Sequence, residues 1–398
     1  MASQRLPCPM PTEPPTDPAP MPTCVSARLP VLRPWLPSTA DLLPYLAQID
    51  QRRWYSNSGP LVTRLEEQLS RHLGFSRHGV VTTANATLGL TVALLARRVP
   101  AGSVCIMPSW TFAATPHAAR AAGLTPWFID VDRQSWALNP EHVTEALRRI
   151  PRPVGALIVV SPFGAPIDVR AWELFEDRTG ISVIVDAAAA FDSTRPSHLP
   201  HVVSLHATKI LGSGEGGFIA STDSQFLERV KACCNFGFQG TRHAMRAALN
   251  AKMSEYHAAV ALASLAAWSE NRLRHVRIMD WYRRGVARVD GVSLQPNYGH
   301  GWVSGTTSVL LPRGARERVL ANLLVSGIET RQWWGEGCHT QPAFVDCPRG
   351  ALPVTEDLGA RVIGLPHFPE MQKQDVDTVL DSVSATKRDR ARERRRIA

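Results

Sequence analysis

The sequence predicts an α/β protein, with a large domain whose mainly parallel sheet is covered by helices and a smaller C-terminal α+β domain. Three features of the 398 residues indicate this class. Strand-like apolar runs alternate with segments of helical periodicity up to residue 207, the order expected of a parallel sheet with crossover helices. Runs such as ALIVV at 156–160 are apolar throughout, as in strands buried on both faces. Beyond residue 226 the pattern becomes helical and then mixed.

Each element follows from its own periodicity. Apolar spacing in LVTRLEEQLSRHL predicts a helix over 61–73, and VVTTA predicts the first strand at 80–84. The alternation continues with strands at 103–108, 125–132, 154–163, 181–187 and 201–207, and helices at 86–98, 112–122, 140–150 and 168–179. Later elements are a helical stretch from 226, a long broken helix over 254–286, a strand at 306–312 and helices near 315–325 and 374–384.

The two ends of the chain have unusual compositions. Residues 1–22 contain eight prolines, which oppose helix and central strand alike, so we interpret residues 1–30 as a disordered lead. The large domain is placed at 31–286 and the small domain at 287–386. Residues 387–398 hold seven basic and two acidic residues, so this tail carries +5 of the net charge of +9.

Composition argues against several classes of function. The charge excess lies mainly in a tail of the kind that is usually solvated, so no nucleic-acid binding is expected. No apolar run reaches the length of a membrane span and no signal peptide is recognisable, so no membrane association is expected. The seven cysteines form no CxxC pair, which disfavours metal and redox sites and fits a reducing cytoplasm.

Candidate site residues follow predicted strands, where open parallel sheets bind ligands. Ala86 and Thr87 open a helix whose backbone N–H groups would form an anion site, although capping by Asn85 or Thr87 explains the same residues. Asp186 ends the apolar strand ISVIVDA. A buried carboxylate there needs a metal, an arginine or a protonated ring nitrogen of a cofactor, unless it merely caps the following loop.

Lysine usage singles out Lys209. The chain has 39 arginines and five lysines, and only Lys209 directly follows an apolar strand. A partly desolvated amine there can form a Schiff base with an aldehyde, and the alternative is an ordinary surface turn. The glycines at 212, 214 and 217 spell GxGxxG, but a strand follows them instead of a helix. We therefore reject a dinucleotide site in favour of a turn between two strands.

The polar candidates together match one ligand. An anion site, a strand-end carboxylate and a post-strand lysine are what pyridoxal 5′-phosphate (PLP) requires for its phosphate, ring nitrogen and aldehyde. Phe112 follows the strand at 103–108, where an aromatic ring would stack on a flat cofactor. Taken alone, Phe112 favours packing in the core.

From about Arg33 to Val383 the sequence resembles the DegT/DnrJ/StrS family of sugar aminotransferases, which are PLP enzymes of fold type I. The resemblance rests on segments in the family's order and spacing: SNSGPLVTRLEEQL, PSWTFAATPHA, VIVDAAAA, SLHATKILGSGEGG, NAKMSEYHAAVAL, HTQPAF and GLPHFP. It implies that Lys209 is the Schiff-base lysine, Asp186 the partner of the pyridine nitrogen and Phe112 the aromatic residue over the ring. Its other implied contacts are phosphate binders at Ala86, Thr87 and Ser204, and Asn250 reaching the phosphate of a neighbouring subunit in a homodimer.

Three positions depart from the family pattern. Ala189 stands where the family usually has Gln or His, Ala86 replaces a usual glycine, and Ile210 a common asparagine. Relatives with His at the lysine position act as dehydratases, and Lys209 argues against that branch.

The resemblance implies a cytoplasmic, homodimeric aminotransferase that converts a keto sugar, expected to be linked to a nucleotide, to an amino sugar with glutamate as the amino donor. The departure at Ala189 keeps open an altered PLP-binding relative with a regulatory or scaffold role.

Overall fold

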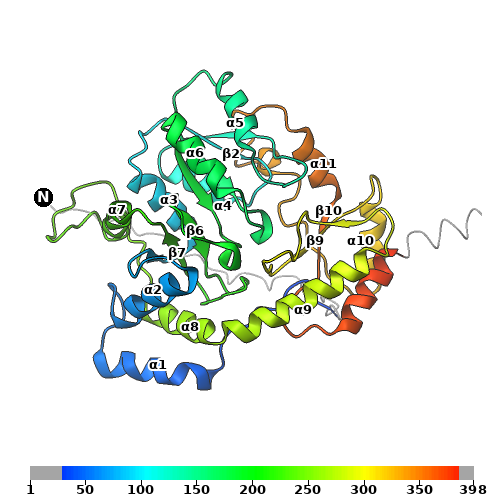
Figure 1. The fold of residues 1–398 in the computed structure, drawn as a ribbon, viewed down its shortest axis with the longest axis horizontal. Coiled ribbons are helices and arrows are strands. Elements are labelled where there is room, and N and C mark those ends of the chain that lie inside the picture. Colours follow the sequence, from blue (N-terminus) through cyan, green and yellow to red (C-terminus); the bar gives the residue numbers. More distant parts are fainter. Residues whose placement is uncertain (1–28, 385–398) are drawn as a thin grey trace, which may run out of the picture.

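The computed structural model describes residues 29–384 and contains a seven-stranded and a three-stranded sheet linked by long helices (Figure 1). The expected α/β fold class is confirmed. Of the expected lead, residues 1–28 lie outside the described residues, and so does the whole basic tail at 387–398.

The large sheet has the strand order β1-β7-β6-β5-β4-β2-β3. Strands β2 to β6 pair in parallel, whereas β7 runs antiparallel to both β1 and β6. Their bounds are β1 (Val80–Thr83), β2 (Val104–Pro108), β3 (Thr125–Ile129), β4 (Val154–Val160), β5 (Ser182–Asp186), β6 (His201–Ser204) and β7 (Gly217–Ala220). The glycine-rich segment therefore joins two antiparallel strands, as the sequence predicted.

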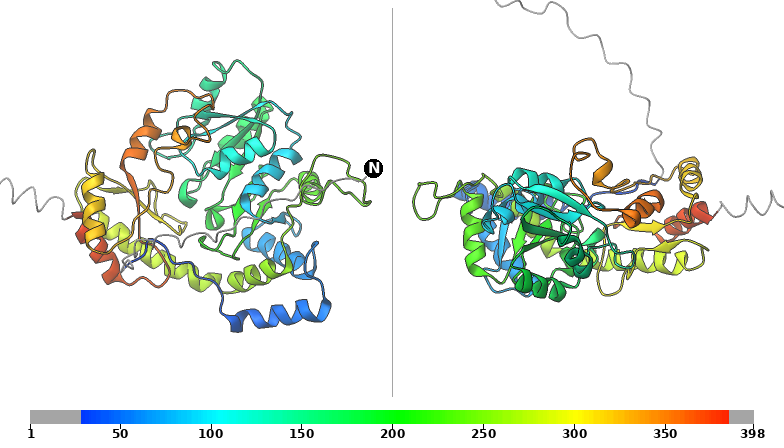
Figure 2. Two further views of the ribbon diagram at one scale, coloured as in Figure 1. Left: turned by 180° about the vertical axis from the view of Figure 1, so that it is seen from behind. Right: turned by 90° about the horizontal axis from the view of Figure 1, so that it is seen from above.

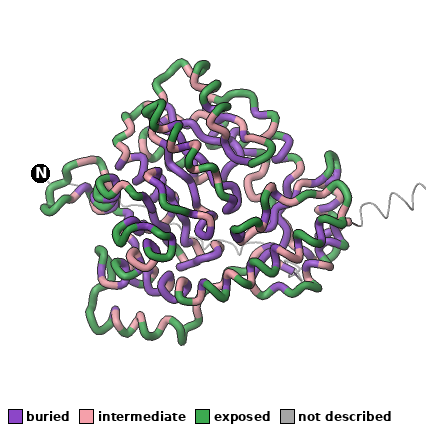
Figure 3. The backbone as a smooth tube through the Cα atoms, in the orientation of Figure 1, coloured by how far each residue is buried: buried purple, intermediate pink, exposed green. Residues whose placement is uncertain are grey.

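Helices cover both faces of this sheet because alternate strand residues point to opposite sides. In β5, Val183 and Val185 belong to one apolar cluster and Ile184 to the other. The first cluster includes α2 (Pro60–Leu73), α5 (Pro140–Leu147), α6 (Val169–Thr179) and α8 (Glu255–Ala266), and the second includes α3 (Ala86–Ala96), α4 (Ala114–Ala121) and α7 (Ser224–Cys234). Figure 3 shows the buried chain running through the middle of these layers.

The helix α9 (Trp268–Val286) leads from the large sheet to the small one (Figure 1). The predicted break in the helix over 254–286 lies at Ala267, between α8 and α9. The small sheet is antiparallel in the order β10-β9-β8. Its elements are β8 (Ser293–Leu294), β9 (Thr307–Leu310), α10 (Arg316–Val325), α11 (Pro353–Arg361), β10 (Val362–Leu365) and a helix over 373–384.

The helix α1 (Thr39–Arg52) was not expected from the sequence. Ser38 caps it in a reciprocal capping box with Asp41, but Pro44 lies inside it and only Ile49 is buried. A helix that is nearly all exposed to solvent needs few apolar residues, so α1 shows little of the apolar spacing by which a helix is predicted from sequence. Residues 29–38 precede α1 as a strap that begins at the small sheet, where the N–H of His367 donates to the carbonyl of Val31 at 3.0 Å.

A buried carboxylate fixes the start of α2. Both oxygens of Glu255, at the beginning of α8, accept backbone N–H groups of α2, from Leu61 at 2.8 Å and Val62 at 2.9 Å. These N–H groups have no acceptor inside their own helix, so the negative side chain satisfies them at the positive helix end. This contact joins two helices nearly 200 positions apart in the chain.

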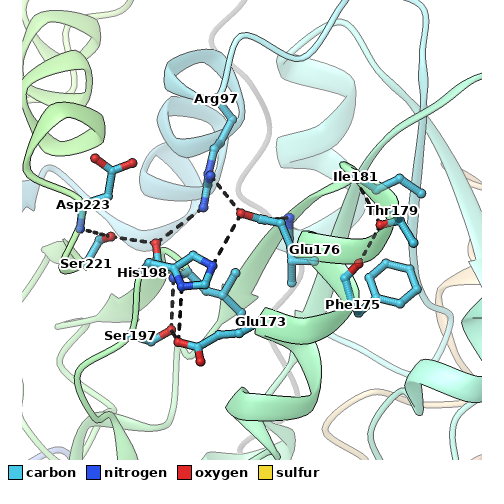
Figure 4. Close-up of polar contacts among 12 residues, drawn as sticks. Arg97, Glu173, Phe175, Glu176, Thr179, Ile181, Ser197, His198, Ser221 and Asp223 are labelled. Carbon is cyan, nitrogen blue, oxygen red and sulfur yellow. Dashed lines mark hydrogen bonds and ion pairs between the residues drawn. The ribbon is translucent and has the colours of Figure 1, made fainter.

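A polar cluster joins α3, α6 and the loop before β6 (Figure 4). Arg97, just after α3, lies 3.1 Å from Glu176 of α6, and each side chain is only 14% exposed. Arg97 also covers the Phe226 ring at 5.2 Å, and the imidazole of His198 lies between Glu173 and Glu176 (Figure 4). Because both charges are largely removed from water, each depends on the other.

We therefore expect Arg97→Met to lower the free energy of unfolding by about 2–4 kcal/mol, because it leaves Glu176 without its cation. Denaturant unfolding measures the loss. The matched control is Arg149→Met, which breaks the exposed pair with Glu145 and should cost less than about 1 kcal/mol. Equal losses in the two variants would contradict the assignment of a buried ion pair.

Candidate active site

The carboxylate of Asp186 ends β5 at the carboxyl edge of the sheet and is 6% exposed. It accepts a hydrogen bond from the Thr115 hydroxyl at 2.8 Å and one from the N–H of Ala188 at 3.2 Å. Within residues 29–384, no cationic side chain lies within ion-pair distance of it. Burial raises the pKa of Asp186, and its two hydrogen bonds and the charge of Lys209 only partly oppose this rise. The group is a buried carboxylate without a cation in contact.

The amine of Lys209 lies in the turn between β6 and β7, in electrostatic range of Asp186. Its backbone N–H donates to the carbonyl of His206 at 2.9 Å, which holds the turn. Burial lowers the pKa of Lys209, and the charge of Asp186 acts in the opposite direction. An amine with a lowered pKa is unprotonated more often at neutral pH, as a nucleophile requires.

The start of α3 faces the end of the β6–β7 hairpin. Asn85 caps α3 by accepting the N–H of Leu88 at 2.9 Å, so the capping interpretation is correct for this residue. The N–H groups of Ala86 and Thr87 in the first turn still lack an acceptor within the helix. A Cβ atom on Gly217 would lie 2.8 Å from the Ala86 nitrogen, so the glycine keeps this approach open.

Ser204 borders the same helix end, because it ends β6 directly opposite Gly217. Its hydroxyl oxygen accepts the N–H of His206 at 3.2 Å, which leaves the hydroxyl proton for another acceptor. Ala86, Thr87 and Ser204 therefore lie around the same helix start, next to Gly217, and their role as phosphate binders stays a prediction.

Phe112 and Asn250 are both exposed. Phe112 has 63% of its surface accessible, so packing in the core, which the residue alone favoured, is wrong. Asn250 lies beside the same helix end, since the N–H of Ala84 donates to the carbonyl of Ala251 at 2.7 Å. No hydrogen bond of the Asn250 side chain is found in the described part of the chain.

Comparison with known proteins decides which family has this site. The family model of the DegT/DnrJ/EryC1/StrS aminotransferase family matches residues 38–384. The chain belongs to this family. The expectation of a PLP-dependent aminotransferase of fold type I is thereby confirmed.

Individual relatives of this aminotransferase match along most of their length. Protein Rv3402c of Mycobacterium tuberculosis is 30% identical over 89% of both chains. The dTDP-4-amino-4,6-dideoxy-D-glucose transaminase of Escherichia coli is 27% identical over 87% of this chain and 95% of its own. Among solved structures, DesI in the presence of its TDP-sugar product is 33% identical over 92% of this chain and 95% of that chain, with a TM-score of 0.81.

Two threonines at the site of this aminotransferase were not predicted from the sequence. Thr115 holds Asp186, and the hydroxyl of Thr111 lies 2.9 Å from that of Thr115. Both belong to PSWTFAATPHA, but the hydrogen bond from Thr115 to Asp186 spans 71 positions and leaves no local signal. Within residues 29–384, no cluster of three His, Cys, Asp or Glu residues has the arrangement of a metal site. In that same range no helix is both long and apolar enough to cross a bilayer.

The lowered pKa of Lys209 predicts its reactivity in the cofactor-free aminotransferase. At pH 7–8 a larger fraction of this amine is unprotonated than of the amine of an ordinary lysine. Lys209 should therefore be acylated faster than an ordinary lysine. Competitive labelling with trace acetic anhydride and peptide mass spectrometry measures the rate against Lys373, an exposed lysine. Asp186→Asn should increase the rate further by removing the charge that raises the pKa. A rate at or below that of Lys373 in both proteins would contradict the prediction.

Proposed function

We propose that this aminotransferase binds PLP at Lys209 and transfers an amino group from glutamate to a keto sugar carried on a nucleotide. One observation carries the proposal: the buried carboxylate of Asp186, without a cation in contact, lies in electrostatic range of the amine of Lys209. A protonated pyridine nitrogen would supply the missing cation, and an aldehyde would react with the amine.

The residues at the site fit the parts of PLP. Lys209 would bind the aldehyde and Asp186 the ring nitrogen. Ala86 and Thr87 offer backbone N–H groups at a helix start, which suits a phosphate, and the cradle stays open because Gly217 has no side chain. The hydroxyl of Ser204 adds a further donor. Phe112, exposed beside the sheet edge, would cover one face of the ring.

Each residue then has a task in the reaction. When bound, PLP supplies an electron sink for the carbon from which a proton is removed. Lys209 Nζ, as a free amine, takes that proton from the donor carbon and delivers it again as general base and acid. Asp186 holds a positive charge at the ring nitrogen. A bound, protonated ring nitrogen would in turn favour the ionised form of Asp186 and oppose the effect of its burial.

The choice of a nucleotide-linked keto sugar is supported by the relatives. The Escherichia coli relative is named for a dTDP-amino sugar, and DesI was solved with its TDP-sugar product. Glutamate as donor is the expectation that the family resemblance gave.

A homodimer is part of the proposal. The segment after α7 projects from the body of the protein as an arm (Figures 1 and 2). Phe236 and Met245 on it are exposed apolar residues, and Asn250 at its end has an exposed side chain. A second copy would bury these apolar groups and bring Asn250 to the phosphate of the neighbouring site.

Two measurements test the proposal. Borohydride reduction followed by peptide mapping should find the cofactor on Lys209, and an adduct on another lysine, or none, would refute it. Glutamate should then convert the bound cofactor to its amine form, and a panel of keto-sugar nucleotides should convert it back. A cofactor that stays on Lys209 but is never converted would favour the regulatory alternative, which Ala189 suggests because a methyl group cannot hydrogen-bond the cofactor.

A further inference from the structure

A small cavity lies beside Lys209, between the strap that precedes α1 and one face of α9. Its volume is about 20 Å³, which is room for one or two water molecules, about the size of a carboxylate head group. Arg33 lines it from the strap, and Asn271 and His275 line it from α9, one helical turn apart. No acidic side chain is among its lining residues in the described chain.

Two of the lining residues are largely buried and have side-chain polar atoms that bond to nothing else in the described chain. Asn271 is 5% exposed, and residues 29–384 provide no hydrogen bond to its side-chain amide. His275 is 4% exposed, and the structure records a hydrogen bond for its Nδ1 atom alone. Neither the Asn271 amide nor His275 Nε2 is sealed from solvent without a partner, so these atoms open on the cavity, where a ligand can form their hydrogen bonds.

A chain of hydrogen bonds determines which nitrogen of His275 carries the proton. The hydroxyl of buried Tyr298 has its closest acceptor in Thr307 Oγ1 at 2.6 Å, so it donates there. Thr307 then donates to His367 Nδ1 at 2.9 Å. His367 Nε2 accordingly carries a proton and donates to His275 Nδ1 at 3.0 Å.

The proton of a neutral His275 is therefore on Nε2, which makes this atom a donor. Burial keeps the ring neutral, since it lowers the pKa of His275 to about 4. The relay thus presents a fixed N–H group and not a variable charge.

Arg33 supplies the charge. Its guanidinium lies 4.7 Å from the centre of the Phe368 ring, which holds one face of the group. Within the described residues it has no carboxylate partner, unlike Arg272 and Arg274 nearby, which pair with Asp192 and Glu270. A positioned cation with its hydrogen-bond donors free suits an oxyanion.

We propose that Arg33, Asn271 and His275 form the site for the carboxylate of the amino-acid donor. The proposal rests on the proposed function and names its donor-binding residues. An amino acid carries its α-carboxylate on the reacting carbon itself, so the carboxylate must bind close to Lys209. The phosphates of a nucleotide sugar are separated from the reacting carbon by the sugar ring, so they would bind further from Lys209 than an α-carboxylate does.

Binding of maleate, an unreactive dicarboxylate, tests the site directly. Calorimetric titration of the full-length protein with and without PLP should give about tenfold weaker binding for Arg33→Met and a larger loss for Asn271→Asp, which adds a repelling charge. Arg33→Lys should restore part of the affinity. The control Arg64→Met removes an arginine that stacks on Tyr45 outside this cavity and should leave binding unchanged.

A second titration separates the two sources of an oxyanion. Thymidine diphosphate should bind equally well to wild type and Arg33→Met. Loss of thymidine diphosphate binding with unchanged maleate binding would overturn the proposal in favour of a nucleotide phosphate site, and unchanged binding of both would overturn it outright. Failure of the proposed function is distinct, because the wild type would then carry no PLP on Lys209 and would not react with glutamate.

Discussion

Lys209→Ala is expected to abolish transamination and to leave the fold intact. The variant lacks the amine that we propose binds the aldehyde and moves the proton, so the rate of the proposed glutamate half-reaction should fall by about 10³-fold or more. The change in cofactor absorbance on mixing with glutamate measures this rate. Stability should not fall, because burial of an amine that has no direct ion pair costs free energy in the wild type.

Lys373→Ala is the matched control for this variant. Lys373 forms an exposed ion pair with Asp377 at 2.6 Å, so its loss should affect neither the half-reaction nor the cofactor adduct. Exogenous methylamine should restore part of the activity of Lys209→Ala, since a small amine can take the place of the missing base. Unchanged turnover of Lys209→Ala would show that a different residue holds the cofactor.

Much of the large domain could be predicted from sequence because its strands are buried on both faces. In a run such as that ending at Asp186, continuous apolar character identifies the strand, and the first polar residue marks its end. The same reasoning rejected a dinucleotide site at the GxGxxG segment, which the β6–β7 hairpin confirms. The helix α1 was missed because only one of its residues, Ile49, is fully buried, and because it contains Pro44.

The contacts between site residues were less predictable. Sequence order placed Asp186 at a strand end and Lys209 in the turn after a strand, but it carried no sign that Thr115 would hold the carboxylate. Phe112 taken alone favoured packing in the core, but it is exposed. A single aromatic residue in the sequence does not show whether its ring packs in the core or lies at the surface. The polar cavity beside Lys209 is lined by residues of the strap and of α9. These two segments meet only because the chain folds back at the small sheet, which no local pattern predicts.

Asp186→Asn is expected to separate function from stability. The amide oxygen can still accept the Thr115 hydroxyl, so the site should keep its shape. The negative charge that would hold the ring nitrogen protonated is lost, and the glutamate half-reaction should slow by about 10²-fold or more, as for loss of an aimed charge in other active sites. Absorbance of the bound cofactor measures the rate, and the Michaelis constant for glutamate should change less than the rate.

The stability of the cofactor-free protein should respond to pH with a definite sign. The pKa of Asp186 is raised in the folded state, so its favourable contribution is complete below the unfolded value near 3.8 and is lost as the pH rises through the folded pKa. Asp186→Asn has no such loss. Relative to wild type, the variant should therefore gain stability as the pH rises across this interval, which denaturant unfolding at several pH values measures.

Asp192→Asn provides the contrast between a paired and an unpaired buried aspartate. Asp192 is 9% exposed, close to the 6% of Asp186, but it pairs with Arg272 at 2.7 Å. Removing its charge leaves a cation without its partner, so this variant should be destabilised at neutral pH. Addition of PLP should stabilise wild type and Asp192→Asn more than Asp186→Asn, because only Asp186 gains a cation when the cofactor binds. If PLP stabilised all three proteins equally, Asp186 would not face the ring nitrogen.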